Sequence, residues 1–321
     1  MHADLMRKLL LFLMLAVFGC SLPGAAAADT PHDATAPSDD TPRYEKRHDT
    51  ALLLVAFGST YPEPHATYAR QLAQFREAFP EADIFLSFTS GVCIRRWEAR
   101  SGERYFMPDV WLASFAAKGY RRVCVQSLHI FPGEEFQLLR DRYIGADAAP
   151  AVCCGTALLT SDADIEAVGR VLADTFAAEL QAGEAVAFMG HGNARAAYAE
   201  ANGAYARIER AMQTYAAARY GNGRIFVGTV DYEPMLIGHV IEQLEAAGVP
   251  KKTPVNLHPL MAVAGDHANN DMSDEEDDES WISLLKAAGW TTVKPTVKGL
   301  GDYPAVNAIW IDHLREAMAG R

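Results

Sequence analysis

The sequence predicts an α/β fold of two similar doubly wound lobes, each built on a parallel sheet, with an active-site cleft between them. Short apolar runs alternate with stretches of helical length along most of the chain. The alternation restarts after residue 160, and each half contains an apolar run that ends in a glycine-containing loop, at 51–58 and 185–190. We therefore expect an N-terminal lobe at 50–160 and a C-terminal lobe at 161–321.

The individual elements follow from these runs. Buried strands are predicted at 51–57, 84–88, 123–128, 185–189, 225–230 and 255–257. Helices are predicted at 61–79, 107–118, 135–143, 162–181, 204–220, 235–247, 280–288 and 305–318. Most of these helices lie between strands, which is typical of a parallel sheet that is covered on both faces.

Composition and charge narrow the functional classes. The 321 residues are 50% hydrophobic and 22% charged, which is ordinary for a globular protein. The formal net charge is -12 and no run of basic residues stands out. We therefore expect no nucleic-acid partner, whereas an acidic surface suits a protein that handles cations.

The N-terminus has the layout of an export signal. Arg7 and Lys8 precede an apolar run at 9–17, and small residues follow at 25–28. We interpret 1–28 as a cleavable signal peptide, which predicts a periplasmic protein without a stable membrane span in the mature chain. An uncleaved anchor and lipidation at Cys20 are the alternatives. Residues 29–49 are rich in Asp, Thr, Pro and Ala and predict a flexible tether.

Four cysteines follow the leader, at Cys93, Cys124, Cys153 and Cys154. Their spacing matches no zinc framework. An oxidising compartment would permit disulfides. Because Cys124 lies in a strand-like run and adjacent cysteines do not easily bond to each other, we favour buried thiols.

Residues directly after the predicted strands are candidates for ligand binding, because ligands of such sheets bind beyond the carboxyl ends of the strands. Their side chains carry hydroxyl, imidazole or carboxylate groups that could converge on one cleft. These residues are Ser59, Thr60, Thr89, Ser90, His129, His191, Asp231, Glu233 and His267.

Two histidines form the centre of this prediction. His191 has a glycine on each side, which allows a sharp turn and leaves the imidazole at a strand end. His267 follows Asp266 after a second apolar run. Two imidazoles beyond separate strands, with Asp231 or Glu233 beyond a third, favour an open site for a divalent ion that must leave again. Neutral imidazoles also accept protons near neutral pH.

Other polar features have simpler interpretations. His129 is predicted either to contact a ligand or to hydrogen-bond a loop, and His258, between apolar residues, is predicted to pack. The six consecutive carboxylates at 274–279 favour a solvated helix start over a cation-collecting surface. The chain has no phosphate-binding loop with Lys-Ser/Thr, no Gly-x-Ser-x-Gly elbow and no His-Glu-x-x-His helix.

Several motifs in one order resemble the anaerobic cobalt chelatases of cobalamin synthesis, the sirohydrochlorin cobaltochelatases of the CbiK type. They are Ala-Phe-Gly-Ser-Thr-Tyr at 56–61, Phe-Thr-Ser-Gly at 88–91 with Ile-Arg-Arg at 94–96, Gln-Ser-Leu-His-Ile at 126–130, Met-Gly-His-Gly at 189–192, Ala-Gly-Asp-His-Ala at 264–268, Asn-Asp-Met at 270–272 and Gly-Leu-Gly at 299–301.

The resemblance implies a class II chelatase fold that holds sirohydrochlorin or a related tetrapyrrole in the cleft, without ATP. It implies that His191 and His267 are the catalytic, metal-binding histidines and that Co²⁺ is the substrate metal, with Fe²⁺ as an alternative. Asp231 stands where the family usually has Glu, and Glu233 is a second candidate for this acidic role. Insertion would release two protons from the macrocycle.

The leader departs from the resemblance, because cobalamin is made in the cytoplasm. Periplasmic proteins that resemble this chain imply haem binding and a homo-oligomer. Ser59, Thr60, Thr89, Ser90 and His129 are our candidates for contact with the tetrapyrrole or with haem. The alternatives to a chelatase are a non-catalytic periplasmic carrier of haem or metal and a generic periplasmic binding protein.

Overall fold

The computed structural model describes residues 41–145 and 152–320, which form one compact unit from Thr41 onward. The predicted signal peptide and residues 29–40 of the predicted tether lie outside the described residues. In the described part of the chain, no helix has both the length and the apolar character needed to cross a bilayer.

The first lobe is built on a four-stranded parallel sheet with the strand order β2-β1-β3-β4. Residues 51–55 of β1 have no exposed surface, and Ala56 is only 2% exposed. This inner strand is therefore covered on both faces. The elements of this lobe are β1 (Thr50–Ala56), α2 (Pro62–Ala78), β2 (Ala82–Phe88), α3 (Gly91–Ser101), α4 (Pro108–Ala117), β3 (Arg122–Ser127), α5 (Glu134–Leu138), a π-helical turn (Leu139–Ile144) and β4 (Cys153–Gly155).

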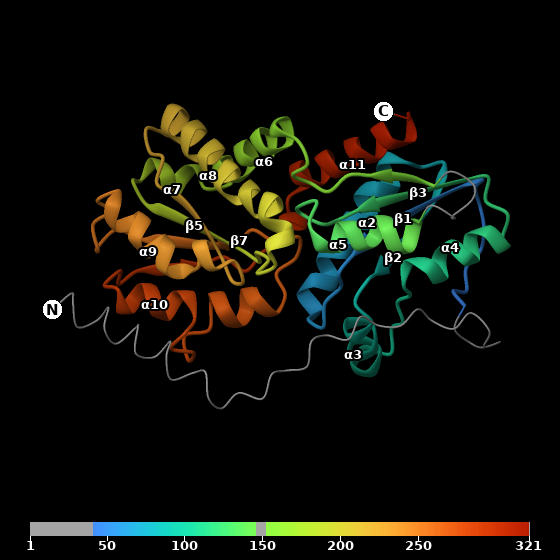
Figure 1. Ribbon diagram of the computed structural model, residues 1–321, viewed down its shortest axis with the longest axis horizontal. Coiled ribbons are helices and arrows are strands. Elements are labelled where there is room, and N and C mark those ends of the chain that lie inside the picture. Colours follow the sequence, from blue (N-terminus) through green and yellow to red (C-terminus); the bar gives the residue numbers. More distant parts are fainter. Residues whose placement is uncertain (1–40, 146–151, 321) are drawn as a thin grey trace. The chain divides into compact units, whose positions relative to one another are not determined.

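The second lobe repeats this design with the order β6-β5-β7-β8, again parallel (Figure 1). Its regular elements are α6 (Asp162–Thr175), α7 (Ala177–Gln181), β5 (Ala185–Gly190), α8 (Ala199–Tyr220), β6 (Ile225–Thr229), α9 (Ile237–Ala246), β7 (Val255–Pro259), α10 (Trp281–Ala287) and β8 (Val293–Pro295). The last helix of the chain is α11 (Pro304–Met318). Shorter turns lie at Ala196–Tyr198, Glu233–Met235, Ala268–Met272 and Leu300–Asp302. The predicted α/β fold with two parallel sheets is confirmed.

The last helix crosses back to the first lobe. Helix α11 packs on β3, β4 and α2, so the C-terminal end of the chain covers the first sheet (Figure 1). Residue 160 lies between β4 and α6, and α11, within the range expected for the C-terminal lobe, packs mostly on elements of the first lobe. Trp310 and Leu314 of this helix are fully buried, and burial of large apolar side chains stabilises this crossing by about 2 kcal/mol each.

The predicted tether ends earlier than expected, because residues 44–49 pack on the first lobe. The Tyr44 ring lies 4.7 Å from the Phe85 ring, centroid to centroid. The backbone N–H groups of Arg47 and His48 donate to the Asp83 carboxylate. One aromatic side chain and these backbone bonds are enough to anchor a segment whose composition otherwise resembles a linker.

The cysteine prediction is wrong for one pair. Cys124 and Cys153 lie opposite each other on the neighbouring strands β3 and β4 and form a disulfide. Cys93 and Cys154 are free thiols. The disulfide was missed because β4 has only three residues, too few to be recognised as a strand from the sequence pattern.

The acidic run at 274–279 precedes α10 as two consecutive tight turns. The Asp274 and Asp277 carboxylates each accept the backbone N–H two residues further on. Ser280 then caps the helix by accepting the N–H of Ser283. The carboxylates therefore lie ahead of the helix start, and most of them are exposed.

Candidate active site

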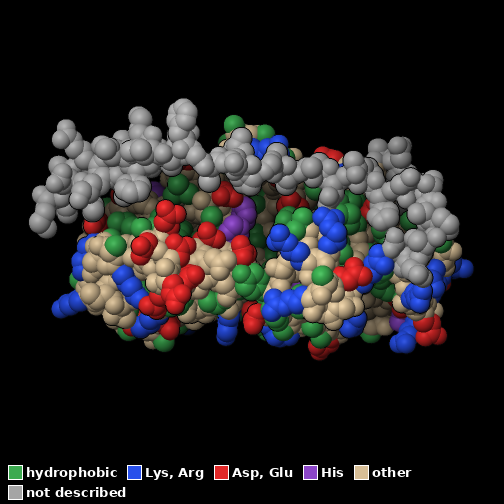
Figure 2. Space-filling model, turned by 90° about the horizontal axis from the view of Figure 1, so that it is seen from below, with side chains coloured by type: hydrophobic (Ala, Val, Ile, Leu, Met, Phe, Trp, Pro, Cys, Tyr) green, Lys and Arg blue, Asp and Glu red, His purple; other side chains and the backbone are tan. Residues whose placement is uncertain are grey.

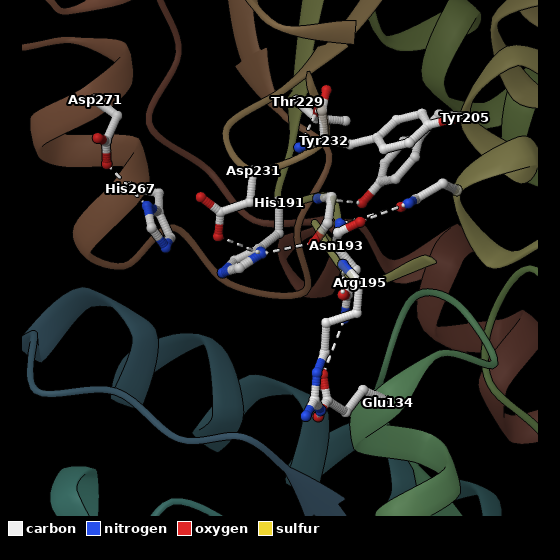
Figure 3. Close-up of polar contacts among 12 residues, drawn as sticks. Glu134, His191, Asn193, Arg195, Tyr205, Thr229, Asp231, Tyr232, His267 and Asp271 are labelled. Atoms are coloured by element: carbon white, nitrogen blue, oxygen red, sulfur yellow. Dashed lines mark hydrogen bonds and ion pairs between the residues drawn. The ribbon is translucent and has the colours of Figure 1, made fainter. Parts of the chain in front are cut away.

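His191 and His267 lie together, as predicted, although they follow different strands of the second sheet. Their rings are 4.7 Å apart, centroid to centroid, and are perpendicular. Both side chains are partly exposed, at 52% and 33%. Figure 3 shows the two rings side by side, with Asp231 next to His191 and Asp271 behind His267. The structure thus brings two candidate ligands from separate loops to one place.

A hydrogen bond at Nδ1 determines which tautomer each ring adopts. The Nδ1 of His191 is 2.9 Å from the Gly192 carbonyl oxygen, which can only accept, so Nδ1 carries the proton. The Nδ1 of His267 is 2.8 Å from the Asp271 carboxylate. In this tautomer the ring lone pair of each histidine is on Nε2. A carboxylate behind an imidazole is the usual way to orient a metal-binding histidine and raise its basicity.

The loop that carries His191 requires its two glycines. A side chain on Gly190 would lie 2.2 Å from the Tyr205 ring, and one on Gly192 would lie 2.7 Å from the Tyr232 nitrogen. Gly192 also has a φ of +80°, which favours glycine. The hydroxyl of Tyr205 accepts the Gly192 N–H at 2.9 Å. Helix α8 thereby holds the loop in place and keeps the imidazole at the strand end.

Of the two candidate acids, Asp231 is the one that lies beside the histidines. Its carboxylate is 3.6 Å from the His191 Nδ1, and its backbone N–H donates to the His191 carbonyl. Glu233 is exposed in the short turn Glu233–Met235, and no contact joins it to either histidine. Within residues 41–145 and 152–320, no group of three His, Cys, Asp or Glu side chains is close enough to hold a metal ion.

Asp271 contacts His267 but was not among the predicted site residues. Asp271 lies four residues after His267, at the spacing that brings two side chains together on one helical face. This four-residue spacing is the feature of the sequence from which the contact between Asp271 and His267 could have been predicted. The turn Ala268–Met272 supplies the helical geometry.

A cavity of about 600 Å³ opens in front of the histidines, a volume within the usual range for small-molecule sites. The lining side chains come from loops at the ends of β1, β3, β5 and β7 and from the starts of α5 and α8. Among the predicted contact residues, Ser59, Thr60 and His129 line this cavity, as do His191 and His267.

Thr89 and Ser90 do not line the cavity. The Thr89 hydroxyl donates to the Glu135 carboxylate at 3.1 Å, and Ser90 accepts the Cys93 N–H and caps α3. Burial raises the pKa of Glu135, which itself lines the cavity. These two hydroxyls thus support lining residues.

His129 is held in place at the cavity wall. Its Nδ1 is 2.9 Å from the Ser127 hydroxyl, and its Nε2 is buried without a partner among the described residues. Burial lowers the pKa of His129 to about 4, so the ring is neutral. His258, by contrast, is fully buried between the Pro259 carbonyl and the Tyr303 hydroxyl, and its predicted packing role is confirmed.

Two sets of polar contacts join the lobes at the cavity. The Tyr61 hydroxyl of the first lobe donates to Asp266 of the second at 2.9 Å. From the first lobe, Glu134 accepts from the Asn193 amide at 3.1 Å and forms an ion pair with Arg195 (Figure 3). The sequence could not reveal these contacts, because each joins residues far apart in the chain.

Two parallel sheets around a shared cavity, with paired imidazoles at the end of the second sheet, define a two-lobed α/β metal chelatase. Two solved structures share this fold. SirB from Bacillus subtilis with Fe³⁺ superposes with a TM-score of 0.56 at 13% identity, covering 84% of this chain and 96% of that chain. CbiX, the terminal enzyme of siroheme biosynthesis in denitrifying bacteria, superposes with a TM-score of 0.50 at 17% identity, covering 84% and 99%.

The chain belongs to the cobalt chelatase (CbiK) family, whose sequence profile matches residues 50–319. It is similar to the sirohydrochlorin cobaltochelatase of Salmonella typhimurium, at 35% identity over 84% of this chain and 96% of the relative. It is also similar to the sirohydrochlorin cobaltochelatase CbiKC of Nitratidesulfovibrio vulgaris, at 31% identity over 89% of this chain and 95% of the relative.

Proposed function

We propose that this protein is a sirohydrochlorin cobaltochelatase, which inserts Co²⁺ into the macrocycle and releases two protons. The observation that carries the proposal is the pair of imidazoles, His191 and His267, at the wall of a cavity shared by the two lobes. Membership of the cobalt chelatase family and the names of both relatives support the same reaction.

The site residues have distinct tasks in this reaction. The Nε2 atoms of His191 and His267 present lone pairs to an incoming ion, because their Nδ1 atoms donate to fixed acceptors. Asp231 adds a negative charge beside His191. Once the pyrrole nitrogens take over the ion, the imidazoles are free to accept the protons that the macrocycle loses.

The test is an optical assay. Purified mature protein is incubated with sirohydrochlorin and Co²⁺, and the absorption of the macrocycle is followed against a control without protein. We expect a catalytic, metal-dependent spectral change, with many turnovers per protein molecule. A stoichiometric change that stops at one equivalent would support the non-catalytic carrier instead. The same assay with Fe²⁺ tests the alternative metal.

Haem binding and a homo-oligomer are further parts of the proposal. His129 is the candidate haem contact, supported by its unpartnered Nε2 beside the cavity. Reconstitution with haem, read by the Soret band of wild type and of His129→Ala, tests this role. Sedimentation of the mature protein tests the oligomer.

Export to the periplasm is supported by two observations. The leader at 1–28 has the layout of a signal peptide, and a disulfide joins Cys124 and Cys153, a bond that persists in oxidising compartments. Cell fractionation, with mass spectrometry of the mature N-terminus, tests the location. Recovery of the full-length chain in the cytoplasm would contradict it.

A further inference from the structure

The walls of the cavity do not match the charge of the proposed substrate, whose periphery carries acetate and propionate groups. In the described part of the chain, no Lys or Arg lines the cavity, whereas Glu134, Glu135 and Asp266 do. If the protein acts on sirohydrochlorin, as proposed above, the carboxylates of the macrocycle must find cations at the rim.

Helix α3 presents such cations beside the cavity. Arg95, Arg96 and Arg100 are exposed on this helix, and we call them the α3 basic surface. The sequence has no obvious basic run, but Arg96 and Arg100 are four residues apart and share a helical face, and Arg95 adjoins Arg96. In the described residues, Arg95 and Arg96 have no ion-pair partner.

The start of α3 is attached to the cavity wall. The backbone N–H of Ser90 donates to the Phe57 carbonyl at 3.0 Å, and Cys93 in the first turn of the helix lines the cavity. Further along, the Arg100 guanidinium donates to the Thr60 carbonyl at 3.1 Å. Phe57 and Thr60 both line the cavity, so the α3 basic surface lies at its rim.

Other arginines near the cavity are already paired. Arg195 pairs with Glu134, and Arg70 pairs with Asp302. A carboxylate that bound either of them would have to displace an existing partner. Arg95 and Arg96 can bind a new carboxylate without that cost.

An apolar surface lies next to the α3 basic surface. Phe57 and Val92 are exposed at 48% and 45%, and they are two of the four large hydrophobic side chains exposed in the described residues. A ligand that is apolar in its plane and anionic at its edge complements this combination. On the second lobe, the acidic run at 274–279 would repel such an edge.

Figure 2 shows this asymmetry, with acidic side chains on one side of the exposed histidine and basic side chains on the other. We propose that the α3 basic surface binds peripheral carboxylates of the tetrapyrrole and thereby orients the macrocycle over Phe57, in front of His191 and His267. Arg95 and Arg96 are specificity-determining residues for a polycarboxylate substrate, and they take no part in the chemistry.

The test is a binding titration of metal-free sirohydrochlorin, followed by its fluorescence. The double variant Arg95→Gln/Arg96→Gln is compared with Arg76→Gln/Arg219→Gln, which removes the same charge from exposed positions in the last turns of α2 and α8. We expect Kd to rise about tenfold in the first variant, as for two exposed charge pairs, and to change less than about twofold in the control. Salt should weaken binding to wild type more than to the first variant.

Two further measurements separate this inference from the proposed function. In the insertion assay, Arg95→Gln/Arg96→Gln should raise KM for sirohydrochlorin without raising KM for Co²⁺, and Arg95→Lys/Arg96→Lys should restore most of the loss. Equal Kd values for the two Gln variants would overturn the inference while leaving the chelatase intact. If wild type binds sirohydrochlorin but inserts no cobalt, the proposed function fails, and the Kd values still decide the inference.

Discussion

The two lobes have the same strand order but end their equivalent strands in different chemistry. The central strand of the first sheet, β1, is followed by Phe57 and Ser59, whereas the central strand of the second sheet, β5, is followed by His191 and Asn193. Both loops line the same cavity. One topology thus provides an apolar wall with hydroxyls on one side and a partly exposed imidazole on the other.

The next pair of strands differs in the same way. After β3, His129 is half-buried, neutral and held by Ser127, whereas the segment after β7 carries the partly exposed His267, oriented by Asp271. The fold therefore positions equivalent loops in both lobes, and the residues in those loops determine the chemistry of each lobe. Under the proposed function, the first lobe would receive the macrocycle, and the second lobe would handle the ion and the protons.

The largest expected effect tests that division directly. His191→Ala and His267→Ala should each lower kcat for cobalt insertion about 100-fold or more, because each removes a lone pair that binds the ion or accepts a proton. His239→Ala, on α9 outside the cavity, is the matched control in the same lobe. Circular dichroism should show all three variants folded, since the site histidines are partly exposed. Near-normal turnover of both site variants would place the chemistry elsewhere.

Much of the fold could be predicted, because long apolar runs determine the central strands. All six predicted strands formed, whereas β4 and β8 were missed because each has three residues at a sheet edge. Helix α3 was missed because it buries little more than Trp97 and its glycine start. Short edge strands and exposed helices leave too little periodic burial for a sequence pattern to show.

The site could be predicted where a residue directly follows a recognisable strand, and most readily where the local sequence also demands a special backbone. His191 stood out because it lies between glycines that the fold requires. Asp271 and Glu134 did not stand out, because their roles depend on contacts made after folding. The Cys124–Cys153 bond depends in the same way on two strands pairing in register. Local patterns therefore identify the reactive residue more readily than the groups that support it.

The second prediction concerns the bond that distinguishes the first sheet. Cys124→Ser/Cys153→Ser should lower the free energy of unfolding by about 3 kcal/mol, because the disulfide closes a loop between residues 29 positions apart. Urea unfolding with and without reductant measures this change. Cys93→Ser, which alters a free thiol, should leave the effect of reductant intact. Equal sensitivity of wild type and double variant to reductant would show that the bond adds no stability.

Buried carboxylates provide a third contrast between the lobes. Burial alone would raise the pKa of Asp83 in the first lobe, but hydrogen bonds from Tyr120, Arg47 and His48 outweigh burial and lower it. In the second lobe, burial raises the pKa of Glu209 to about 7, although its carboxylate accepts the Val227 N–H. The two carboxylates should therefore affect stability in opposite directions near neutral pH.

For Glu209 the folded state binds the proton more tightly than the unfolded state, so stability falls as pH rises between the two pKa values. From about pH 5 to about pH 7 this loss should be about 2 kcal/mol. Glu209→Gln keeps an acceptor for the Val227 N–H but does not titrate, so its stability should fall less over this range. Urea unfolding at both pH values measures the difference, and parallel pH profiles would contradict the assignment.

The smallest expected effect decides between the two candidate acids of the second lobe. Asp231→Asn should lower kcat about tenfold, because the carboxylate lies 3.6 Å from the His191 Nδ1 and stabilises positive charge beside the ion. Glu233→Gln removes the same charge from an exposed turn, where no contact joins it to either histidine, and should change kcat less than about twofold. Steady-state insertion kinetics with Co²⁺ compare the two variants. If Glu233→Gln were the slower enzyme, Glu233 and not Asp231 would have the acidic role. The turn that carries Glu233 would then have to move toward His191 when the substrates bind, because the fold places Asp231 beside the imidazole.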